Sequence, residues 1–292
     1  MNVFTIKDLE NLSGIKAHTI RIWEQRYQFL KPSRTGTNIR YYSNEELKKV
    51  LNIALLNKYG YKISHIDKMN DAEVKEKIFS LTQMQAQQER IVNDLIKHMI
   101  DLDIEKYEEV LDKFILARGI ERAITQIIFP FLERIGVLWV TNHINPAQEH
   151  LVTNIVRQKL IVGIEGTSAS IKVNKTILLF LPEGEYHELG LLFVYYLLKS
   201  RGVSVLYLGA DVPLNDVEYV VKLKKPNYLF THITAAGGHF HLDKFIANIN
   251  KRFSGIPMVI SGKLTHAYEK KIPPQMNFKK SFQDVLEFIA AL

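Results

Sequence analysis

Residues 173–292 alternate between two apolar patterns, and this alternation is the strongest constraint on the fold. Short strand-type runs are separated by longer stretches with helical spacing. Parallel strands need a crossover connection, usually a helix, so the pattern predicts a parallel doubly wound sheet of the five-stranded flavodoxin-like (Rossmann-like) kind. The strand-type runs are Thr176–Leu181, Val203–Leu208, Tyr228–Ile233 and Met258–Ser261, and the helical stretches are His187–Ser200, Leu214–Lys224, Leu242–Phe253 and Phe282–Ala291.

Residues 71–166 are predicted to be nearly all helix, in a four-helix bundle. Short connections such as Arg118-Gly119 favour antiparallel neighbours. Pro130 is expected to kink or split its helix, because proline has no N–H to donate, and residues 166–170 are the best linker candidate. The predicted helices are Asp71–Phe79, Gln83–Asp101, Ile104–Ala117, Ile120–Val140 and Pro146–Val162.

Residues 1–70 combine short helices with a turn-rich segment. Thr5 and Asp8 have the spacing of a capping box, and Gly14 ends the helix that follows. Pro32 and Gly36 exclude a helix between the second helix and a short strand. This order predicts a winged helix-turn-helix, within a multidomain chain of α and α/β parts. Its expected elements are helices at Lys16–Tyr27, Ser43–Asn57 and Tyr61–Met69, and a strand at Ile39–Tyr42.

The excess positive charge of the chain lies almost entirely in this first module. Residues 1–70 hold 12 Lys and Arg against 6 Asp and Glu, whereas the other 222 residues hold 26 against 25. A basic terminal module on a nearly neutral body predicts a polyanionic partner, with double-stranded DNA first. The alternative is a basic surface that serves solubility, or a helix-turn-helix that contacts only protein.

Donor side chains on the second helix and on the wing fit the chemistry of a duplex. Ile20 and Trp23 are expected to pack inward. Base edges and phosphates are then read from the opposite face of the helix, and the wing reaches the neighbouring backbone. The predicted DNA-binding residues are His18, Thr19, Arg21 and Arg26 on the helix, and Arg34, Arg40 and Tyr41 on the wing.

These residues also carry a resemblance. Phe4-Thr-Ile, Leu12-Ser-Gly-Ile15, His18-Thr-Ile-Arg-Ile-Trp-Glu24 and Arg40-Tyr-Tyr-Ser43 resemble the MerR-type winged helix-turn-helix. The resemblance implies a transcription factor that binds a pseudo-palindromic operator as a dimer or tetramer. The family's long dimerisation helix is not evident after the module, so another part must supply self-association. The chain has no cysteine, which excludes thiolate metal sensing, disulfides and iron–sulfur clusters.

A histidine stands where the predicted sheet would bind a ligand. His187 follows the first strand, and ligands of open α/β sheets bind outside the carboxyl ends of the strands. Its imidazole can ligate a metal if the other ring nitrogen is held by a carboxylate, and Glu185 is the nearest candidate. The alternative is a histidine near a helix start with no special role.

The surrounding pattern resembles the cobalamin-binding domain, whose usual signature is Asp-x-His-x-x-Gly, Ser-x-Leu and Gly-Gly. Here the matching positions are Glu185, His187 and Gly190, then Asp211, then Thr231 and Ile233, then Ser261 and Gly262. The resemblance implies that His187 is the lower axial cobalt ligand, that Glu185 steadies it, and that the later strand ends form a slot for the nucleotide tail. Glu185, Thr231-x-Ile233 and Ser261 depart from the signature. The first change is mild, whereas Thr231 and Ser261 are expected to narrow that slot, which puts the affinity in doubt without excluding binding.

Trp139 and Glu149-His150 have the Trp-x(9)-Glu-His spacing of helical domains that cap cobalamin in light-dependent regulators. The whole chain thus resembles CarH/LitR-like photoreceptor regulators, with a reader at 1–70, a cap at 71–166 and a cobalamin domain at 173–292. This implies a repressor whose oligomeric state and DNA affinity are controlled by cobalamin, either adenosylcobalamin or methylcobalamin. Trp139 and Glu149 would face the upper ligand, and His150 would coordinate cobalt after photolysis.

Two other functions stay open at this point. One is a cofactor-independent regulator whose C-terminal half serves only oligomerisation. The other is a corrinoid enzyme or methyl carrier, which is disfavoured because no catalytic barrel of about 250 residues is present. The longest apolar run, Leu189–Leu198, is about half of a membrane span, so we expect a cytoplasmic protein without a membrane partner.

Overall fold

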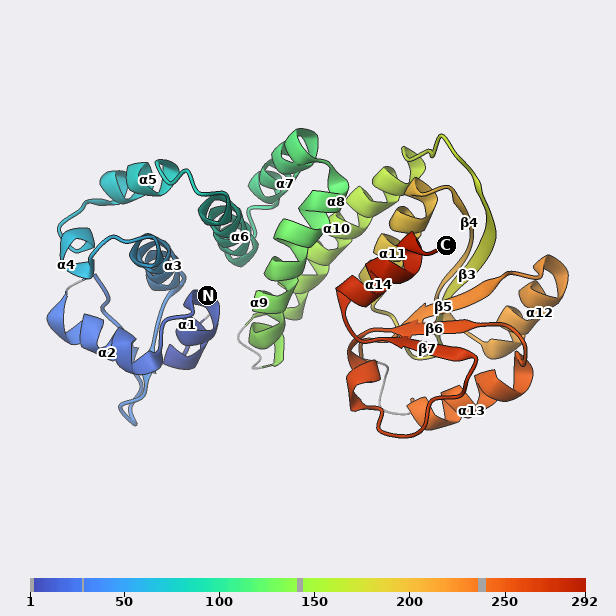
Figure 1. The fold of residues 1–292 in the computed structure, drawn as a ribbon. Helices are drawn as coiled ribbons and strands as arrows, with labels where there is room; N and C mark the ends of the chain where they lie inside the picture. The colour runs from blue at the N-terminus through green and yellow to red at the C-terminus, as the bar shows by residue number, and fades with distance from the viewer. Residues whose placement is uncertain (1–2, 28, 141–143, 236–239) are drawn as a thin grey trace. The chain divides into compact units, whose positions relative to one another are not determined.

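A computed structural model describes residues 3–27, 29–140, 144–235 and 240–292, without the side chains of 137–140 and 267 (Figure 1). The chain divides into two compact units, Met1–Val156 and Arg157–Leu292. The first unit holds both the predicted reader and most of the predicted bundle, and the second holds the sheet.

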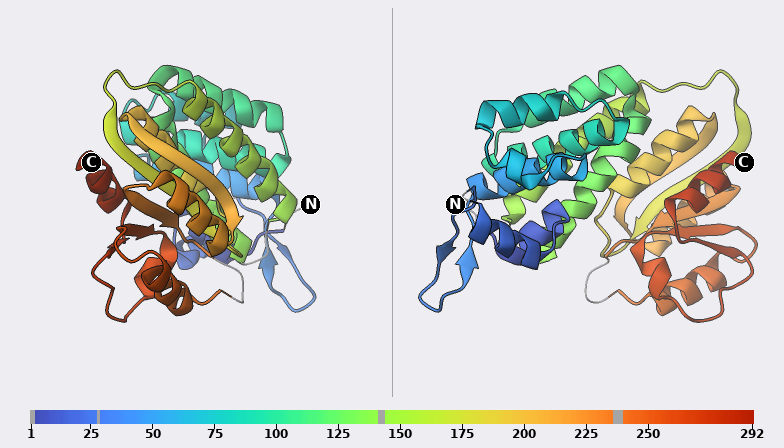
Figure 2. Two further views of the ribbon diagram at one scale, coloured as in Figure 1. Left: turned by 90° about the vertical axis from the view of Figure 1, so that its right-hand side faces the viewer. Right: turned by 60° about the vertical axis from the view of Figure 1, so that its left-hand side comes forward.

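The reader is a winged helix-turn-helix, as predicted. Thr5 and Asp8 form the expected capping box, and Gly14 ends the first helix with φ 74°. Ser43 and Glu46 cap the helix after the wing in the same way. The wing pairs the predicted strand with a second one that the sequence did not reveal, and this hairpin projects from the module (Figure 2). The elements are α1 (Ile6–Ser13), α2 (Ala17–Arg26), β1 (Ser33–Arg34), β2 (Arg40–Tyr41), α3 (Asn44–Lys58) and α4 (Ile63–Ile66).

The helical region follows the predicted order, with one irregularity. Its helices are α5 (Asp71–Phe79), α6 (Met84–Asp101), α7 (Ile104–Arg118), α8 (Ile120–Ala123), α9 (Phe129–Val140) and α10 (Pro146–Glu165). A π-helical turn at Ile124–Ile128 separates α8 from α9, and the N–H of Phe129 donates to the carbonyl of Ile124. Pro130 therefore follows a widened turn, because a residue without N–H cannot bond the carbonyl four positions earlier.

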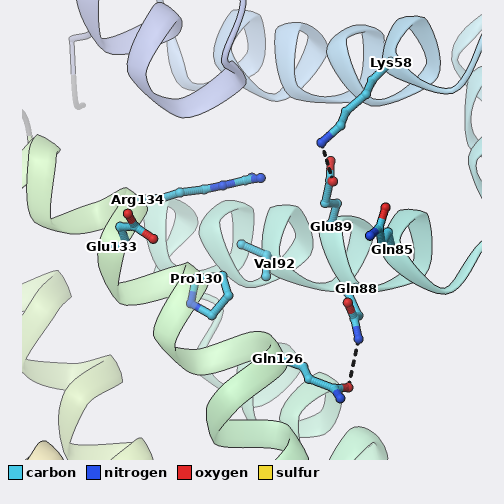
Figure 3. A pocket seen from close by; sticks show the side chains of 9 residues that line it. All are labelled: Lys58, Gln85, Gln88, Glu89, Val92, Gln126, Pro130, Glu133 and Arg134. Carbon is cyan, nitrogen blue, oxygen red and sulfur yellow. Dashed lines mark hydrogen bonds and ion pairs between the residues drawn. The ribbon is translucent and has the colours of Figure 1, made fainter. Parts of the chain in front are cut away.

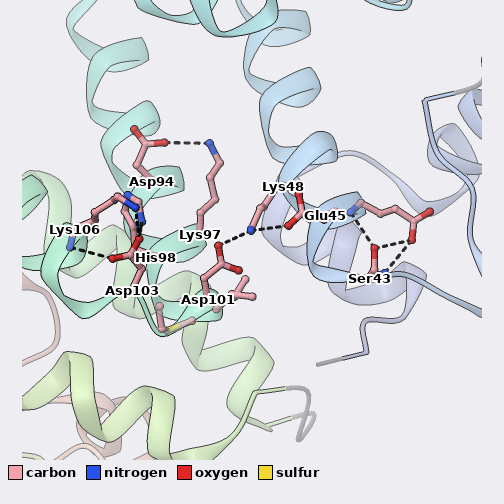
Figure 4. Close-up of polar contacts among 12 residues, drawn as sticks. Ser43, Glu45, Lys48, Asp94, Lys97, His98, Asp101, Asp103 and Lys106 are labelled. Atoms are coloured by element: carbon pink, nitrogen blue, oxygen red, sulfur yellow. Dashed lines mark hydrogen bonds and ion pairs between the residues drawn. The ribbon is translucent and has the colours of Figure 1, made fainter. Parts of the chain in front are cut away.

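Polar contacts join α3 of the reader to α6 of the bundle. Lys48 forms an ion pair with Asp101 at the end of α6 (Figure 4). Lys97 Nζ donates to Asn52 Oδ1 at 2.8 Å. Buried Asn93 of α6 donates to the carbonyl of Leu51 at 3.5 Å. We call these contacts the α3–α6 seam; they hold residues 48–52 of α3 against the C-terminal half of α6.

A second set of contacts extends from α6 to the other helices of the first unit. Arg134 of α9 donates to Asn93 Oδ1 at 2.7 Å, beside a cavity of about 440 Å³ that Lys58, Glu89 and Arg134 help to line (Figure 3). The buried Gln148 of α10 donates to the carbonyls of Met99 and Ile100 at 3.3 and 3.0 Å. Both helices that carry the predicted cap residues thus rest on α6.

The second unit is a five-stranded parallel sheet in the described residues, in the order β4-β3-β5-β6-β7. This is the flavodoxin-like order, as predicted. The last strand was not predicted. Helices α11 and α14 form one layer, in which the rings of Phe193 and Phe282 stack. Helices α12 and α13 pack on the other face of the sheet, where their buried residues share a hydrophobic core with the strands. The elements are β3 (Val173–Pro182), α11 (Leu189–Ser200), β4 (Val203–Val212), α12 (Leu214–Lys224), β5 (Tyr228–His232), α13 (Leu242–Arg252), β6 (Met258–Ser261), β7 (Met276–Lys279) and α14 (Phe282–Ala290).

The centre of β3 anchors this sheet, since Ile177, Leu178, Leu179, Phe180 and Leu181 are all fully buried. A strand buried on both faces suits a parallel sheet that is covered by helices on both sides. Within the described residues, no helix is both long enough and apolar enough to cross a bilayer.

Candidate functional site

The strand order places a topological switch point at the carboxyl ends of β3 and β5, and we call the region outside these two strand ends the crevice. From β3 the chain crosses through α11 to β4, which pairs with one edge of β3. It then returns through α12 to β5, which pairs with the other edge of β3, and β6 and β7 follow beyond β5. In doubly wound sheets this switch point is where ligands bind. Glu185 and His187 lie in the segment after β3, and Thr234 and Ala235 follow β5.

The carboxylate of Glu185 bridges these two segments. One oxygen accepts hydrogen bonds from His187 Nδ1 at 2.6 Å and from the His187 main-chain N–H at 2.9 Å. The other oxygen accepts from the main-chain N–H groups of Thr234 at 2.7 Å and Ala235 at 2.9 Å. The side chain is fully buried, so we call this group of contacts the Glu185 bridge.

The hydrogen bonds of the Glu185 bridge keep the Glu185 carboxylate ionised and place a proton on His187 Nδ1. Burial by itself raises the pKa of Glu185, but the hydrogen bonds from His187, Ala235 and Thr234 outweigh it and lower the pKa to about 2. Because an ionised carboxylate can only accept, Nδ1 of His187 carries a proton, and in the neutral imidazole Nε2 then holds the lone pair. About half of the His187 side chain is exposed, so its ring is accessible at the crevice.

Asp211 holds the same segment from β4. Its Oδ1 accepts from the Gly184 N–H at 2.9 Å, and its own N–H donates to the Glu185 carbonyl at 3.2 Å. Asp211 has φ 58°, an uncommon value for a residue other than glycine, and this conformation turns both groups toward the β3–α11 segment. The residue predicted from the resemblance thus lies beside Glu185.

The ends of β5 and β6 contain Thr231 and Ser261, the two departures from the cobalamin signature that are expected to narrow the slot. Thr231 Oγ1 is buried and has no hydrogen-bond partner among the described residues. Ser261 Oγ lies 2.8 Å from His232 Nδ1 and donates to the Thr231 carbonyl at 3.4 Å. The hydroxyl of Ser261 is therefore directed at the β5 strand end. Ile233 is fully buried, and its N–H donates to the Ser261 carbonyl at 2.8 Å.

Gly262 is required at its position by sterics and by backbone conformation. A Cβ there would lie 2.4 Å from the Ile233 carbonyl oxygen, and its φ is +100°. Gly262 therefore lets the turn after β6 approach the end of β5.

Sequence reasoning missed His232. It stands at the variable position of the Thr-x-Ile motif, so no motif pointed to it. Burial lowers its pKa to about 4, which the charge of Glu185 partly opposes and His187 reinforces. His232 is therefore a neutral ring at physiological pH, and it packs beside Gly190.

The described residues fit a cobalt corrinoid. An imidazole oriented by a buried carboxylate is the usual way in which a protein prepares a histidine for a metal. The unpartnered Thr231 hydroxyl is a buried polar group that a ligand can satisfy, since such groups are normally hydrogen-bonded.

The predicted residues of the upper face belong to the first unit. Glu149 and His150 lie in the first turn of α10, with His150 Nδ1 3.0 Å from Glu149 Oε2, and the His150 side chain is 71% exposed. The side chain of Trp139, near the end of α9, lies outside the described residues. These three assignments stay predictions.

In the reader, the predicted DNA-binding side chains of α2 face solvent, and the side chains predicted to pack inward are buried. His18, Arg21 and Arg26 are exposed and Thr19 is partly exposed, while Ile20 and Trp23 are buried. On the wing, Tyr41 is partly buried and Arg34 is exposed.

Glu24 links the wing to α2, which the sequence did not predict. Arg40 Nε donates to Glu24 Oε2 at 2.8 Å, and Arg34 Nη2 lies 3.6 Å from Glu24 Oε1. Hydrogen bonding to Glu24 raises the pKa of Arg40, although burial opposes the change. Arg40 thus fixes the wing to α2. Its contact with a DNA phosphate stays a prediction.

Known proteins resemble the chain in the same order of parts. Residues 4–73 match the MerR HTH family regulatory protein model, and residues 91–162 match a B12 binding domain model. The chain is 27% identical over 259 residues to the HTH-type transcriptional repressor CarA of Myxococcus xanthus, covering 88% of this chain and 85% of CarA. It is 25% identical over 274 residues to the repressor CarH of that organism, covering 91% of each.

The fold is also similar to a solved structure, the monomethylamine corrinoid protein of Methanosarcina barkeri. The likeness covers 70% of this chain and all of that one, with 14% identity and a TM-score of 0.51. This comparison supports the helical and sheet architecture alone.

Removing the Glu185 carboxylate should loosen the crevice. Glu185→Ala leaves three main-chain N–H groups without their acceptor, at about 1 kcal/mol or more each. We expect amide exchange in β3 and β5 of the ligand-free protein to become roughly 100-fold faster, measured by hydrogen exchange with mass spectrometry. Glu185→Gln keeps an oxygen for Thr234 and Ala235, so its effect should be smaller. Equal exchange in wild type and Glu185→Ala would contradict this role.

Proposed function

We infer that this chain, a CarH-like regulator with a MerR-type reader and a B12 binding domain, is a DNA-binding transcriptional repressor controlled by cobalamin. The observation that carries this inference is the Glu185 bridge, which prepares His187 at the switch point of a chain that begins with a DNA reader. The relatives that match along the whole chain are repressors, so we assign it no catalytic activity.

His187 is the residue that would hold the cofactor. Glu185 keeps a proton on Nδ1, so Nε2 is the ring nitrogen that would serve as lower axial ligand. Thr231, Ile233, Ser261 and Gly262 lie at the ends of β5 and β6, where the nucleotide tail would be accommodated. A bound alkylcobalamin supplies a cobalt–carbon bond that light can break.

Control of DNA binding is proposed to pass through the first unit. The cap helices α9 and α10 rest on α6 through Arg134 and Gln148, and α6 holds α3 of the reader through the α3–α6 seam. The wing precedes α3 directly and is fixed to α2 by Arg40. A change at the cap can therefore reorient the reader without requiring a flexible connection between them.

The upper ligand, the light response and self-association are part of the proposal. Trp139 and Glu149 would face an adenosyl or methyl group in the dark, and His150 would take the upper position once that group is lost. His150 is exposed at the start of α10, so it is free to reorient with modest repacking. We propose that the dark form is a dimer or tetramer that presents paired readers to a pseudo-palindromic operator.

The axial ligand can be read from absorption spectra. His187→Ala should lower cobalamin affinity by roughly 10- to 100-fold or leave cobalt with a different lower ligand, because the carboxylate-held imidazole is gone. The test is absorption titration of wild type and variant with hydroxo- and adenosylcobalamin in the dark. His65→Ala, which alters an exposed histidine of α4 in the reader, is the matched control. A wild-type protein that takes up no cobalamin at tens of micromolar would favour the cofactor-independent alternative.

DNA binding should depend on the reader and on salt. Arg21→Ala should weaken operator binding by about 1–3 kcal/mol and change the sequence preference, because an arginine on this helix reaches base edges. Affinity of the wild type should fall steeply with salt as phosphates are neutralised. Fluorescence anisotropy with a selected duplex measures both effects. Arg122→Ala removes the same charge from an exposed site outside the reader and should have no effect. Salt-independent binding would contradict the assignment.

Light should change the size of the adenosylcobalamin-loaded protein. Converting a mostly assembled to a mostly dissociated population needs about 5 kcal/mol of differential stabilisation. Loss of an upper ligand at Trp139 and coordination by His150 are proposed to supply it. The measurement is size-exclusion chromatography before and after green light, with His150→Ala expected to reduce the shift. Unchanged size and DNA affinity after complete photolysis would refute the light response while leaving cobalamin binding intact.

A further inference from the structure

Three residues from separate segments meet beside the His187 segment. Gly190 lies in the first turn of α11, three positions after His187, while His232 ends β5 and Ser261 ends β6. His232 Nδ1 lies 2.8 Å from Ser261 Oγ, and Ser261 Oγ lies 3.4 Å from the Thr231 carbonyl. Because the carbonyl can only accept, Ser261 donates to Thr231, and His232 Nδ1–H donates to Ser261. The orientation of the His232 ring is therefore fixed.

The other edge of the ring lies directly on Gly190. A Cβ at position 190 would be 2.5 Å from His232 Cδ2 and 2.6 Å from Nε2, closer than non-bonded atoms approach. Gly190 has no left-handed φ, so the need for glycine comes from the ring and not from the backbone. His232 thus determines how near the first turn of α11 comes to the end of β5.

The same two segments are joined a second time by the Glu185 bridge, from Glu185 to Thr234 and Ala235. One join is a hydrogen-bonded carboxylate, and the other is a packed ring held by a buried hydroxyl. Together they define the separation of the two sides of the crevice and the position of the segment that carries His187.

We propose that His232, held by Ser261, is a positioning residue for the lower axial site. This rests on the proposed cobalamin function. Ser261 then has a task different from the one its sequence position suggests. Its side chain is 1% exposed and its hydroxyl is engaged by His232 and Thr231, so it supports the crevice wall and does not obstruct the slot.

Two mutations at Ser261 distinguish support from obstruction. Ser261→Gly restores the usual signature residue, and Ser261→Ala removes only the hydroxyl. If Ser261 supports His232, both variants of the full-length protein bind hydroxocobalamin roughly tenfold more weakly than wild type, a typical loss for a residue that orients a metal ligand. If Ser261→Gly binds more tightly than wild type, Ser261 is an obstruction and the proposal is overturned.

A double-mutant cycle tests the contact between His232 and Gly190. Gly190→Ala should weaken binding by about 10- to 100-fold, because the added methyl displaces either the ring or α11. His232→Asn keeps a donor near Ser261 and removes the ring atoms that face position 190. The double variant should bind like His232→Asn alone, since the clash is gone. Effects that multiply, or a Gly190→Ala variant with unchanged affinity, would overturn the proposal.

The readout that separates positioning from folding is the axial ligand itself. Electron paramagnetic resonance of the bound, reduced Co(II) form, with 15N-labelled histidine, reports whether a histidine nitrogen coordinates. Gly190→Ala and His232→Asn should each weaken this coupling, and the double variant should show the coupling of His232→Asn alone, while hydrogen exchange of β3 and β5 in the ligand-free variants verifies folding. Retention of full histidine coupling in Gly190→Ala would refute the positioning role. Failure of the wild type to bind any cobalamin would refute the proposed function instead.

Discussion

The hydrogen bonds of the buried Glu185 carboxylate are the interactions on which the candidate site of the second unit depends. An ionised group without water is costly unless its hydrogen-bonding capacity is used, and four donors from His187, Thr234 and Ala235 satisfy this one. Because the donors come from both sides of the switch point, the same contacts close the crevice and fix the tautomer of His187. The contacts that orient His187 for a ligand are therefore the same contacts that stabilise the local fold.

The first unit depends on a different kind of contact, packing of helices around α6. The end of α6 contacts Lys48 of α3 and Gln148 of α10, and Asn93 accepts from Arg134 of α9, so the reader and the cap share one support. Such a shared support is a physical route for coupling, and it becomes an allosteric one if cofactor binding shifts its packing between two states. The proposed control of DNA affinity therefore requires that cofactor binding shift the packing around α6.

Much of the architecture could be predicted because it is encoded locally. Capping boxes at Thr5 and Ser43 and the strand–helix alternation after residue 173 set the elements, and the Glu185–His187 pairing followed from spacing. What escaped depends on contacts between distant residues. Strand β7 is short and weakly patterned, and the Arg40–Glu24 pair and the His232–Gly190 contact join segments with no shared motif. Ser261 was interpreted by its size, whereas its hydrogen bonds give it a different role.

The central claim is that cobalamin changes the affinity of this chain for DNA. The most direct measurement is the dissociation constant of a duplex, selected from random sequence, with ligand-free and with adenosylcobalamin-loaded full-length protein in the dark at one salt concentration. The account predicts tighter binding of the loaded protein, by at least about fivefold, the lower range of ordinary allosteric coupling. Equal dissociation constants, with cobalamin shown to be bound through His187, would contradict it.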